Sequence, residues 1–182
     1  MEHKSLKGLE FKDFSEILDF DKKLSKFLDS LDEELQTWRD HTEKNGKRRI
    51  PHAIDGYACL DDENIVGIGY FFRTKKDKVR YFINLLFGCS FKEAEWGGVV
   101  KKEYQRRGIS THLFDLCVKK MKKLGYARVK WYADSNNIRA LKWSENMAHR
   151  IVKRADKKFY FVYNLIDNYC DQTYFQKRGT QD

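Results

Sequence analysis

The sequence predicts a single domain with a mixed α/β (α+β) fold, and three observations support this. The 182 residues are 41% hydrophobic and 15% aromatic, which is enough to bury a sizeable core. Segments with helical periodicity alternate along the chain with segments of period two. The only proline is Pro51, and no Gly/Ser-rich linker divides the chain. We therefore expect one domain over residues 1–166 and a polar C-terminal tail at 167–182.

Two helices are expected in the N-terminal quarter. Apolar residues recur there every three or four positions. Two pairs combine a capping oxygen with an acid three residues later, Asp13 with Glu16 and Ser30 with Glu33. The pattern predicts helices near residues 14–28 and 31–43.

Strands are expected in the middle of the chain. Residues 56–73 alternate and are rich in β-branched and aromatic side chains around a polar turn at 61–64, which predicts a hairpin. Residues 79–88 read as a strand, with a short helix as the alternative. Residues 92–100 form a further strand that contains Gly97 and Gly98, and two glycines inside a strand favour a bulge or a close approach to the backbone.

The C-terminal half alternates between the two periods. Helical spacing from residue 109 to residue 124, followed by Gly125, predicts a helix. Residues 127–133 read as a strand, and Asn136 or Asn137 can cap a second helix that runs to about Met147. Residues 149–154 and 158–165 predict a final antiparallel pair.

Composition and charge limit the location and the partners. No apolar run has the length of a signal peptide or reaches the roughly 18 residues of a membrane span, so we expect a soluble, cytoplasmic protein. The four cysteines are far apart without a CxxC pair, which predicts free thiols and no structural metal. Residues 101–182 carry an excess of 11 positive charges, whereas the first 100 residues are nearly balanced. This asymmetry indicates a polyanionic partner, such as a phosphate-rich cofactor, a membrane surface or a nucleic acid.

One basic turn lies at the head of a predicted helix. The segment Gln105 to Ser110, QRRGIS, joins the strand that ends at Val100 to the helix that begins near Gly108. Unpaired amides at a helix N-terminus bind anions, and Gly108 would let a phosphate approach the backbone closely. Arg106 and Arg107 would add positive charge. The alternative is a solvated basic turn.

The same segment resembles a known motif. QRRGIS is similar to the QxxGxG or RxxGxA pyrophosphate loop of the Gcn5-related N-acetyltransferase (GNAT) superfamily, and Asn137 and Ala140 fit its NxxAxxLYxxxGF pattern. The resemblance covers roughly residues 56–165. It implies a GNAT-like mixed, mostly antiparallel central sheet flanked by helices. It also implies an N-acyltransferase that moves an acetyl group from acetyl-CoA, its acyl-donor co-substrate, to an amine without a metal.

The resemblance also assigns a coenzyme A site. The backbone amides of residues 106–110 would hold the pyrophosphate, and the strand edge at 99–101 would pair with the pantetheine amides. A backbone N–H near Val99 would polarise the thioester carbonyl. The full set of cofactor-binding residues is Val99, Val100, Lys101, Gln105, Arg106, Arg107, Gly108, Ile109, Ser110, Asn137 and Ala140.

A carboxylate is expected to act as the general base. Glu95 lies ten residues before Gln105 on the strand beside the expected thioester, and it could take a proton directly or through water. Glu93 lies on the same strand face and is the second choice. The alternative interpretation is that Glu95 is a solvated residue paired with a lysine.

The general acid is the point where the sequence departs from the family. Ser144 stands where the family often has a tyrosine that protonates the leaving thiolate, so the candidates are Ser144, Tyr132 and Tyr104. Two further departures are Ser110 in place of the third small residue of the loop and Ala148-His149 in place of Gly-Phe. Ser110 could itself cap the helix or bind phosphate.

The acceptor is expected to be a primary amine on a small molecule, a peptide or a protein. Acids at positions 29–43 suggest a cationic acceptor, because the first two helices wall the acceptor groove in this superfamily. The alternatives are a coenzyme A-binding module without turnover and a nucleic-acid-binding protein, although no nucleic-acid-binding motif accompanies the basic region. Acyl length and oligomeric state, including a homodimer, stay open.

Overall fold

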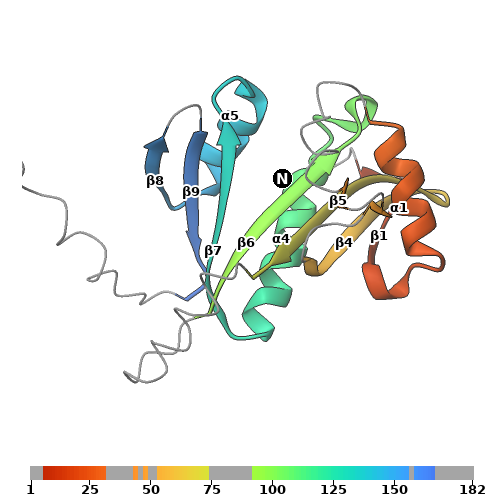
Figure 1. The fold of residues 1–182 in the computed structure, drawn as a ribbon, viewed down its shortest axis with the longest axis horizontal. Helices are drawn as coiled ribbons and strands as arrows, with labels where there is room; N and C mark the ends of the chain where they lie inside the picture. Colours follow the sequence, from red (N-terminus) through yellow and green to blue (C-terminus); the bar gives the residue numbers. More distant parts are fainter. Residues whose placement is uncertain are drawn as a thin grey trace, which may run out of the picture.

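A seven-stranded sheet forms the centre of the molecule (Figure 1). The computed structural model describes residues 6–31, 43–44, 47–48, 53–73, 92–155 and 158–166, and the predicted tail at 167–182 lies outside them. In order across the sheet, the strands are β1 (Leu9–Asp13), β4 (Ala53–Asp61), β5 (Asn64–Phe72), β6 (Lys92–Val100), β7 (Tyr126–Asp134), β9 (Lys158–Asn164) and β8 (Arg150–Ala155). Neighbouring strands are antiparallel except β6 and β7, which are parallel. The predicted mixed, mostly antiparallel sheet is thus confirmed.

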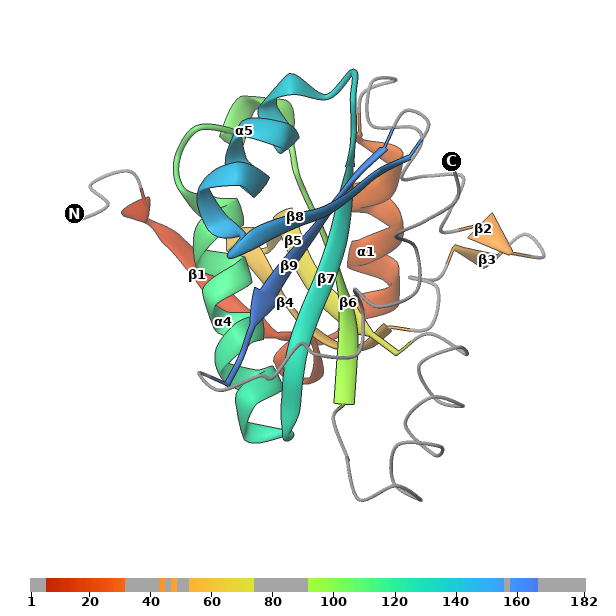
Figure 2. The ribbon, with the colours of Figure 1, turned by 90° about the vertical axis from the view of Figure 1, so that its left-hand side faces the viewer.

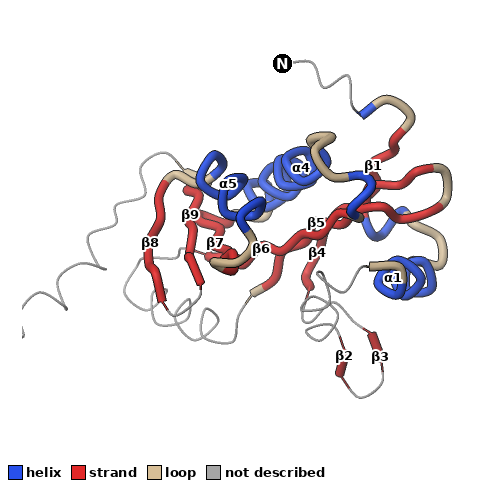
Figure 3. Tube along the Cα trace, turned by 90° about the horizontal axis from the view of Figure 1, so that it is seen from above, coloured by secondary structure: helices blue, strands red, loops and turns tan. Residues whose placement is uncertain are grey.

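Helices cover both faces of this sheet (Figures 2 and 3). On one face, called here the α4 face, lie α4 (Ile109–Lys123) and α5 (Ile138–Met147). On the other, the α1 face, lies α1 (Phe20–Asp29). Two short 3-10 helices, η2 (Phe14–Glu16) and η4 (Lys102–Tyr104), lie before α1 and α4.

The periodicity seen in the sequence produces a core on each face. On the α1 face, Leu24, Phe27 and Leu28 of α1 are buried with Ile68 and Val99 of the sheet. On the α4 face, the buried cluster contains Phe114, Cys117, Met121, Val129 and Phe161. Each fully buried aliphatic or aromatic side chain contributes about 1.5–3 kcal/mol, so these two clusters hold the helices against the sheet.

The strands of the hairpin and of the C-terminal pair are where the sequence predicts them. β4 and β5 are antiparallel neighbours around the turn at Asp62 and Glu63. β8 and β9 form the final antiparallel pair. The expected strand at 79–88 lies outside the described residues. A further two-stranded sheet, β2 (Glu43–Lys44) with β3 (Lys47–Arg48), was not predicted.

The N-terminal helix differs from the prediction at its start. The predicted capping box forms, because Asp13 accepts a hydrogen bond from the Ser15 N–H at 3.1 Å and Glu16 accepts one from the Asp13 N–H at 3.2 Å. It caps only the 3-10 helix η2, because the backbone is extended at Ile17 and left-handed at Asp19, where φ is 55°. The helical conformation therefore stops after Glu16, and α1 begins only at Phe20. The edge strand β1 precedes it and was not located from the sequence.

The second predicted helix start is also corrected. Ser30 is the C-cap of α1, and its hydroxyl donates a hydrogen bond to the Phe27 carbonyl at 2.7 Å. The Ser30 side chain therefore ends a helix and does not begin one. Most of the predicted helix at 31–43 lies outside the described residues, and Glu43 belongs to β2.

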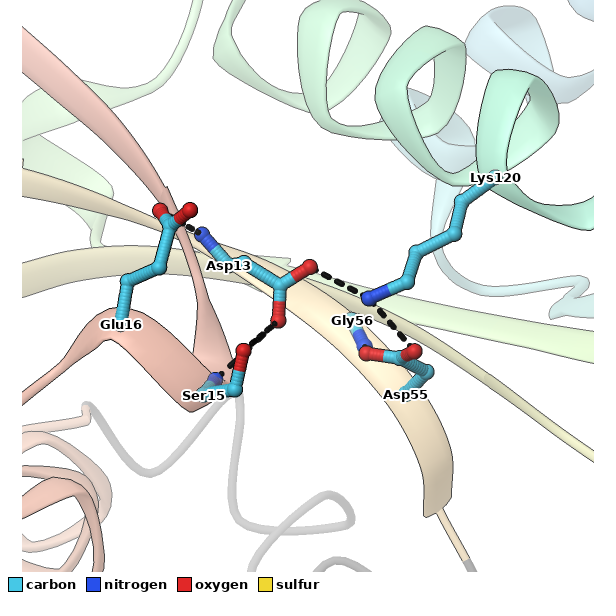
Figure 4. A network of polar contacts seen from close by, with 6 residues as sticks. All are labelled: Asp13, Ser15, Glu16, Asp55, Gly56 and Lys120. Carbon is cyan, nitrogen blue, oxygen red and sulfur yellow. Dashed lines mark hydrogen bonds and ion pairs between the residues drawn. The ribbon is translucent and has the colours of Figure 1, made fainter.

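Lys120 ties α4 to the edge of the sheet (Figure 4). Its ammonium group forms ion pairs with Asp13, the last residue of β1, and with Asp55 of β4. Lys120 also lies 5.4 Å from the ring centre of Tyr57. Lys120 is partly buried and joins three elements, whereas its neighbour Lys119 is exposed.

Replacing Lys120 with Met is expected to lower the free energy of unfolding by about 2 kcal/mol at neutral pH, because two partly buried carboxylates would lose their shared cation. Burial raises the pKa of Asp13, but hydrogen bonds with Lys120 and Ser15 outweigh it and hold the pKa below its ordinary 3.8. A lowered carboxyl pKa stabilises the fold above pH 3.8 and loses this contribution as the pH falls further. Denaturant titrations should therefore show a smaller difference between the two proteins at pH 3 than at pH 7.

Lys119→Met is the matched control, because Lys119 is the exposed neighbour on the same helix. It should change the stability by less than about 0.5 kcal/mol. Equal losses in the two variants would show that the ion pairs of Lys120 contribute nothing.

Candidate active site

β6 and β7 lie side by side over only the first part of their length. They pair from Lys92 to Glu95 on β6 and from Tyr126 to Lys130 on β7. Beyond this ladder β6 pairs only with β5 and β7 only with β9, and the two strands diverge (Figure 1). We call this opening the splay. Its edges present backbone N–H and C=O groups that the short parallel ladder does not use.

The N-terminus of α4 lies at the open end of the splay, because α4 is the crossover that returns the chain from the end of β6 to the start of β7. Gly108 is the N-cap residue, and its φ of 82° lies in the left-handed region that glycine adopts without strain. His112 makes the first intrahelical bond, to the Gly108 carbonyl. The amides of residues 109–111 therefore have no intrahelical acceptor, and no acidic residue stands in the first turn. This arrangement suits an anion.

The structure corrects the role expected for Ser110. Because Gly108 is the N-cap, Ser110 is the second residue inside α4 and does not cap it. Arg106 also has a positive φ, 62°, so the loop turns sharply twice before the helix. Ile109 is buried at 2% exposure, which leaves its backbone amide as the group that could meet a ligand.

Gln105 connects the loop to both sides of the splay. Its Nε2 donates to the Val100 carbonyl at 3.1 Å, and its Oε1 accepts from the Arg139 guanidinium at 2.9 Å. Val100 ends β6 and Arg139 belongs to the first turn of α5. Gln105 therefore holds the loop between the strand and the second helix.

The hydrogen bonds of β6 indicate which of its backbone groups face the splay. The Lys101 N–H donates to the Val66 carbonyl of β5 at 2.9 Å. Because backbone groups alternate along a strand, the Val99 amide also faces β5, and the amides of Gly98 and Val100 face the splay. The sequence predicted a bulge or a close approach to the backbone at Gly97 and Gly98. The ladder with β5 runs through both without a register shift, so no bulge forms there. The close approach is present at Gly98, where a Cβ would lie 2.6 Å from the Trp96 ring.

α5 is capped as the sequence predicted. The Asn137 side chain accepts a hydrogen bond from the Ala140 N–H at 3.0 Å, so these two predicted site residues contact each other. Ala140 packs against the core of the α4 face. On the same helix, the Trp143 indole N–H donates to the Thr111 hydroxyl of α4 at 3.1 Å, which joins α5 to α4.

Ser144 lies in the core. It is only 1% exposed, and its Oγ accepts a hydrogen bond from the Trp131 indole N–H at 2.8 Å. This is a structural role, because the oxygen satisfies a buried donor. The arrangement does not favour Ser144 as a general acid.

Replacing Ser144 with Ala is expected to lower the free energy of unfolding by about 1–3 kcal/mol, because the Trp131 N–H would remain buried without its acceptor. The kcat of the folded variant should stay within about three-fold of wild type, because the hydroxyl takes no part in the proposed chemistry. Denaturant titration and steady-state kinetics measure the two effects.

The variant Trp131→Phe and the double variant complete the test. In the Trp131→Phe background the indole N–H is absent, so Ser144→Ala should lower the free energy of unfolding by less than it does in the wild-type protein. The difference between the two losses is the contribution of the hydrogen bond. A fall in kcat of about 100-fold with unchanged stability would instead identify Ser144 as a catalytic residue.

An aromatic cluster fills the α4 face beside the splay. The Trp96 ring stacks on Trp143 with centres 5.0 Å apart, and it lies 6.4 Å from Trp131. Phe114 meets Trp96 and Trp131 edge-on, each at 5.3 Å. Edge-on and stacked pairs of this kind are favourable beyond their buried area, so this wall is well ordered by its own contacts.

The opposite face of the splay carries the candidate proton-transfer groups. Trp96 and Trp131 lie in the cluster on the α4 face, so alternation turns Glu95 and Tyr132 to the α1 face. Glu95 is partly exposed and Tyr132 is 44% exposed. Burial raises the pKa of Tyr70, and electrostatic interaction with Tyr132 adds to the rise. Tyr70 stands opposite Gly97 in the ladder and is buried with Val99 on the α1 face, so the structure brings it to this site, although no local sequence pattern connects it with Tyr132.

Glu93 and Tyr104 interact with other side chains outside the proposed proton transfers. Glu93 is 7% exposed and forms ion pairs with Arg128 and Lys130. The Tyr104 hydroxyl donates to Asp61 at 2.6 Å, and this hydrogen bond raises its pKa. Glu93 shares the α1 face but is buried, so Glu95 and Tyr132 are the predicted base and acid that are both on this face and partly exposed.

Two further kinds of catalytic group are metal-binding clusters and reactive thiols. No group of three or more His, Cys, Asp or Glu side chains in the described ranges could hold a metal ion. Burial raises the pKa of Cys59 and of Cys117 to about 12, so both thiols stay protonated at neutral pH. Within these same ranges no helix is long and apolar enough to span a bilayer.

Comparison with known proteins finds solved structures of similar fold. No curated protein sequence matches the chain. Solved structures that resemble it include the GNAT domain of PAT from S. lividans (TM-score 0.68, 14% identity, covering 86% of this chain and 90% of that one). NAA60 from Arabidopsis thaliana, crystallised with acetyl-CoA, has a TM-score of 0.61 and 15% identity, and the match covers 86% of this chain and 98% of that one. The PaiA N-acetyltransferase from Thermoplasma acidophilum, crystallised with coenzyme A, has a TM-score of 0.61 and 11% identity, and the match covers 85% of this chain and 99% of that one. At these identities the likeness establishes the fold.

The sequence itself matches a family over most of its length. The match is to the acetyltransferase (GNAT) family and runs from residue 13 to residue 147, which includes the splay, the loop before α4 and the whole of α5. The chain therefore belongs to the GNAT acetyltransferase family.

Proposed function

We propose that this protein is an acetyl-CoA-dependent N-acetyltransferase that acts on a primary amine by direct transfer within a ternary complex. The observation that carries the proposal is the α4 N-terminus, capped by Gly108, at the open end of the splay. Acetyl-CoA supplies an activated acyl thioester. Two relatives of the same fold, NAA60 and PaiA, were crystallised with acetyl-CoA and coenzyme A.

The residues around the splay fit such a donor. The amides of residues 106–110 bind the pyrophosphate, and the basic loop adds charge. The edge of β6 binds the pantetheine amides through Gly98 and Val100, which turn their backbone groups to the splay. One of these two amides, which flank that of Val99, polarises the thioester carbonyl. Lys101, Gln105, Asn137 and Ala140 hold the loop, the strand end and α5 in position.

Glu95 and Tyr132 carry the proton transfers. Glu95 accepts the proton of the acceptor ammonium, directly or through a water molecule, and Tyr132 donates a proton to the leaving thiolate. Tyr132 is favoured over Ser144 and Tyr104 because it is exposed on the face of Glu95, whereas the other two hydroxyl groups are engaged by Trp131 and Asp61.

A short acyl group fits this site best. The cluster of Trp96, Trp131, Trp143 and Phe114 occupies the α4 face where the splay begins. A longer acyl chain would have to displace rings that are packed against one another. We therefore favour acetyl as the transferred group.

An assay with acetyl-CoA and a panel of amines, following the release of free thiol, tests the proposal. Stabilisation of the protein by coenzyme A in a thermal shift assay is the binding control, because a ligand that binds the folded state raises the midpoint. Binding without turnover on any amine would favour a coenzyme A-binding module. The absence of any shift would contradict the proposal itself.

A further inference from the structure

A small hollow lies on the α1 face, apart from the loop before α4. It has a cavity volume of about 60 Å³ and lies between the C-terminal half of α1, the start of β5 and the residue that follows β6. We call it the lysine pocket. It is lined by Lys23, Lys26, Phe27, Ser30, Glu63, Asn64, Ile65 and Lys101.

The charges of the lysine pocket are unbalanced. Among the described residues that line it, three ammonium groups face one carboxylate, that of Glu63, which is 91% exposed and lies 4.0 Å from the Lys23 ammonium, at the limit of an ion pair. Lys26 donates to the neutral Asn64 side chain at 3.1 Å. Lys101 lies 5.9 Å from the ring centre of Phe27. Like charges in one hollow repel each other, so an anionic group that entered it would relieve the repulsion.

The pocket opens on the face of the sheet that carries the proton-transfer groups. Alternation puts Lys101 on the side of Val99, which packs against α1, and of Glu95. The first residue of α4, Ile109, instead packs with Val100 on the α4 face. The lysine pocket is therefore separate from the loop proposed for the pyrophosphate.

Cations and carboxylates are mixed near Glu95. The Lys158 ammonium lies 4.3 Å from the ring centre of Tyr132, and Lys130, opposite Glu95 in the ladder, forms an ion pair with Glu93. The described residues here therefore show no excess of acids that would select the cationic acceptor suggested by the sequence. Most of the acids behind that suggestion lie outside the described residues.

We propose that the acceptor is an acidic polypeptide, one of whose carboxylates occupies the lysine pocket while its amine reaches Glu95. This inference rests on the proposed function. Glu95 and Lys101 are six residues apart on an extended segment, which is about 20 Å. A molecule that meets both sites is therefore as long as a peptide of about six extended residues, and longer than a small amine.

The test compares two peptides that share one amine and differ only in Glu or Gln at the other positions. With wild-type protein, the Glu peptide should have a KM at least about five-fold below that of the Gln peptide. The double variant Lys23→Gln and Lys26→Gln should remove this preference. Lys22→Gln, at an exposed position of α1 outside the pocket, is the matched control and should keep it.

Two readouts separate the failure of this inference from that of the proposed function. Calorimetric binding of the Glu peptide, without any acyl donor, should weaken about five-fold in the double variant whether or not turnover occurs. The KM for acetyl-CoA should not change. If the double variant raised the KM for acetyl-CoA but not the KM for the acetylated dephospho-CoA, the pocket would bind the donor, and the inference would be overturned. Equal use and binding of the two peptides would also overturn it.

Discussion

Gly108→Asp should raise the KM for acetyl-CoA by about 100-fold or more, the largest effect on donor binding that we expect. The new carboxylate would stand at the N-cap of α4 and accept the hydrogen bonds of the first-turn amides. It would also place a negative charge beside the proposed pyrophosphate, and two like charges about 4 Å apart near a protein surface repel by about 4 kcal/mol. Steady-state kinetics and the thermal shift with coenzyme A measure the loss.

Gly108→Asn is the matched control for this substitution. Asn has nearly the same shape as Asp, tolerates the left-handed conformation and also caps helices, but it is neutral. Its KM should rise by about ten-fold only, which reflects the loss of free amides and of space. Equal effects of Asp and Asn would show that charge is not the cause. If neither variant changed the KM, the α4 N-terminus would not be the donor site.

Glu95→Gln should lower kcat by about 100-fold to 10,000-fold, because the amide cannot accept the proton of the acceptor ammonium. The KM for acetyl-CoA should remain within about two-fold, since Glu95 lies on the α1 face and the proposed pyrophosphate site lies at α4. The stability should change little, because the side chain is partly exposed. Single-turnover kinetics at saturating donor would place the loss in the chemical step.

Glu103→Gln serves as the control, because Glu103 is an exposed acid on η4. It should leave kcat unchanged. Full activity of Glu95→Gln would remove Glu95 from the mechanism and return it to the alternative of a solvated residue opposite Lys130. Glu93→Gln is unsuitable as a control, because it would leave Arg128 with a weakened partner in the core.

Local patterns in the sequence predicted the elements that position the donor site. The helix that begins after Gly108, its end at Gly125 and the cap at Asn137 all depend on residues within one helical turn of each other. The edge strand β1 was missed because it is short and partly charged, so that its alternation is weak. The first helix was predicted too early, because a capping box identifies a turn but does not determine how far the helix continues.

The candidate site could be predicted only in part, because its other members come together through the sheet. Tyr70 and Tyr132 lie on strands separated by β6, and the bond between Trp131 and Ser144 joins a strand to the helix that follows it. The lysine pocket combines α1, the start of β5 and Lys101. Contacts of this kind depend on strand order and register, which no spacing along the chain specifies.

The close packing of tryptophan side chains at the splay gives the protein an intrinsic fluorescence signal beside the candidate site. Three of its four tryptophans, Trp96, Trp131 and Trp143, lie with ring centres 5.0–6.4 Å apart. Excitation energy absorbed by one ring can pass readily to the others at such separations, so one quenching group near any of them would dim the emission of all three. Donor occupancy could thus be followed by fluorescence without a label.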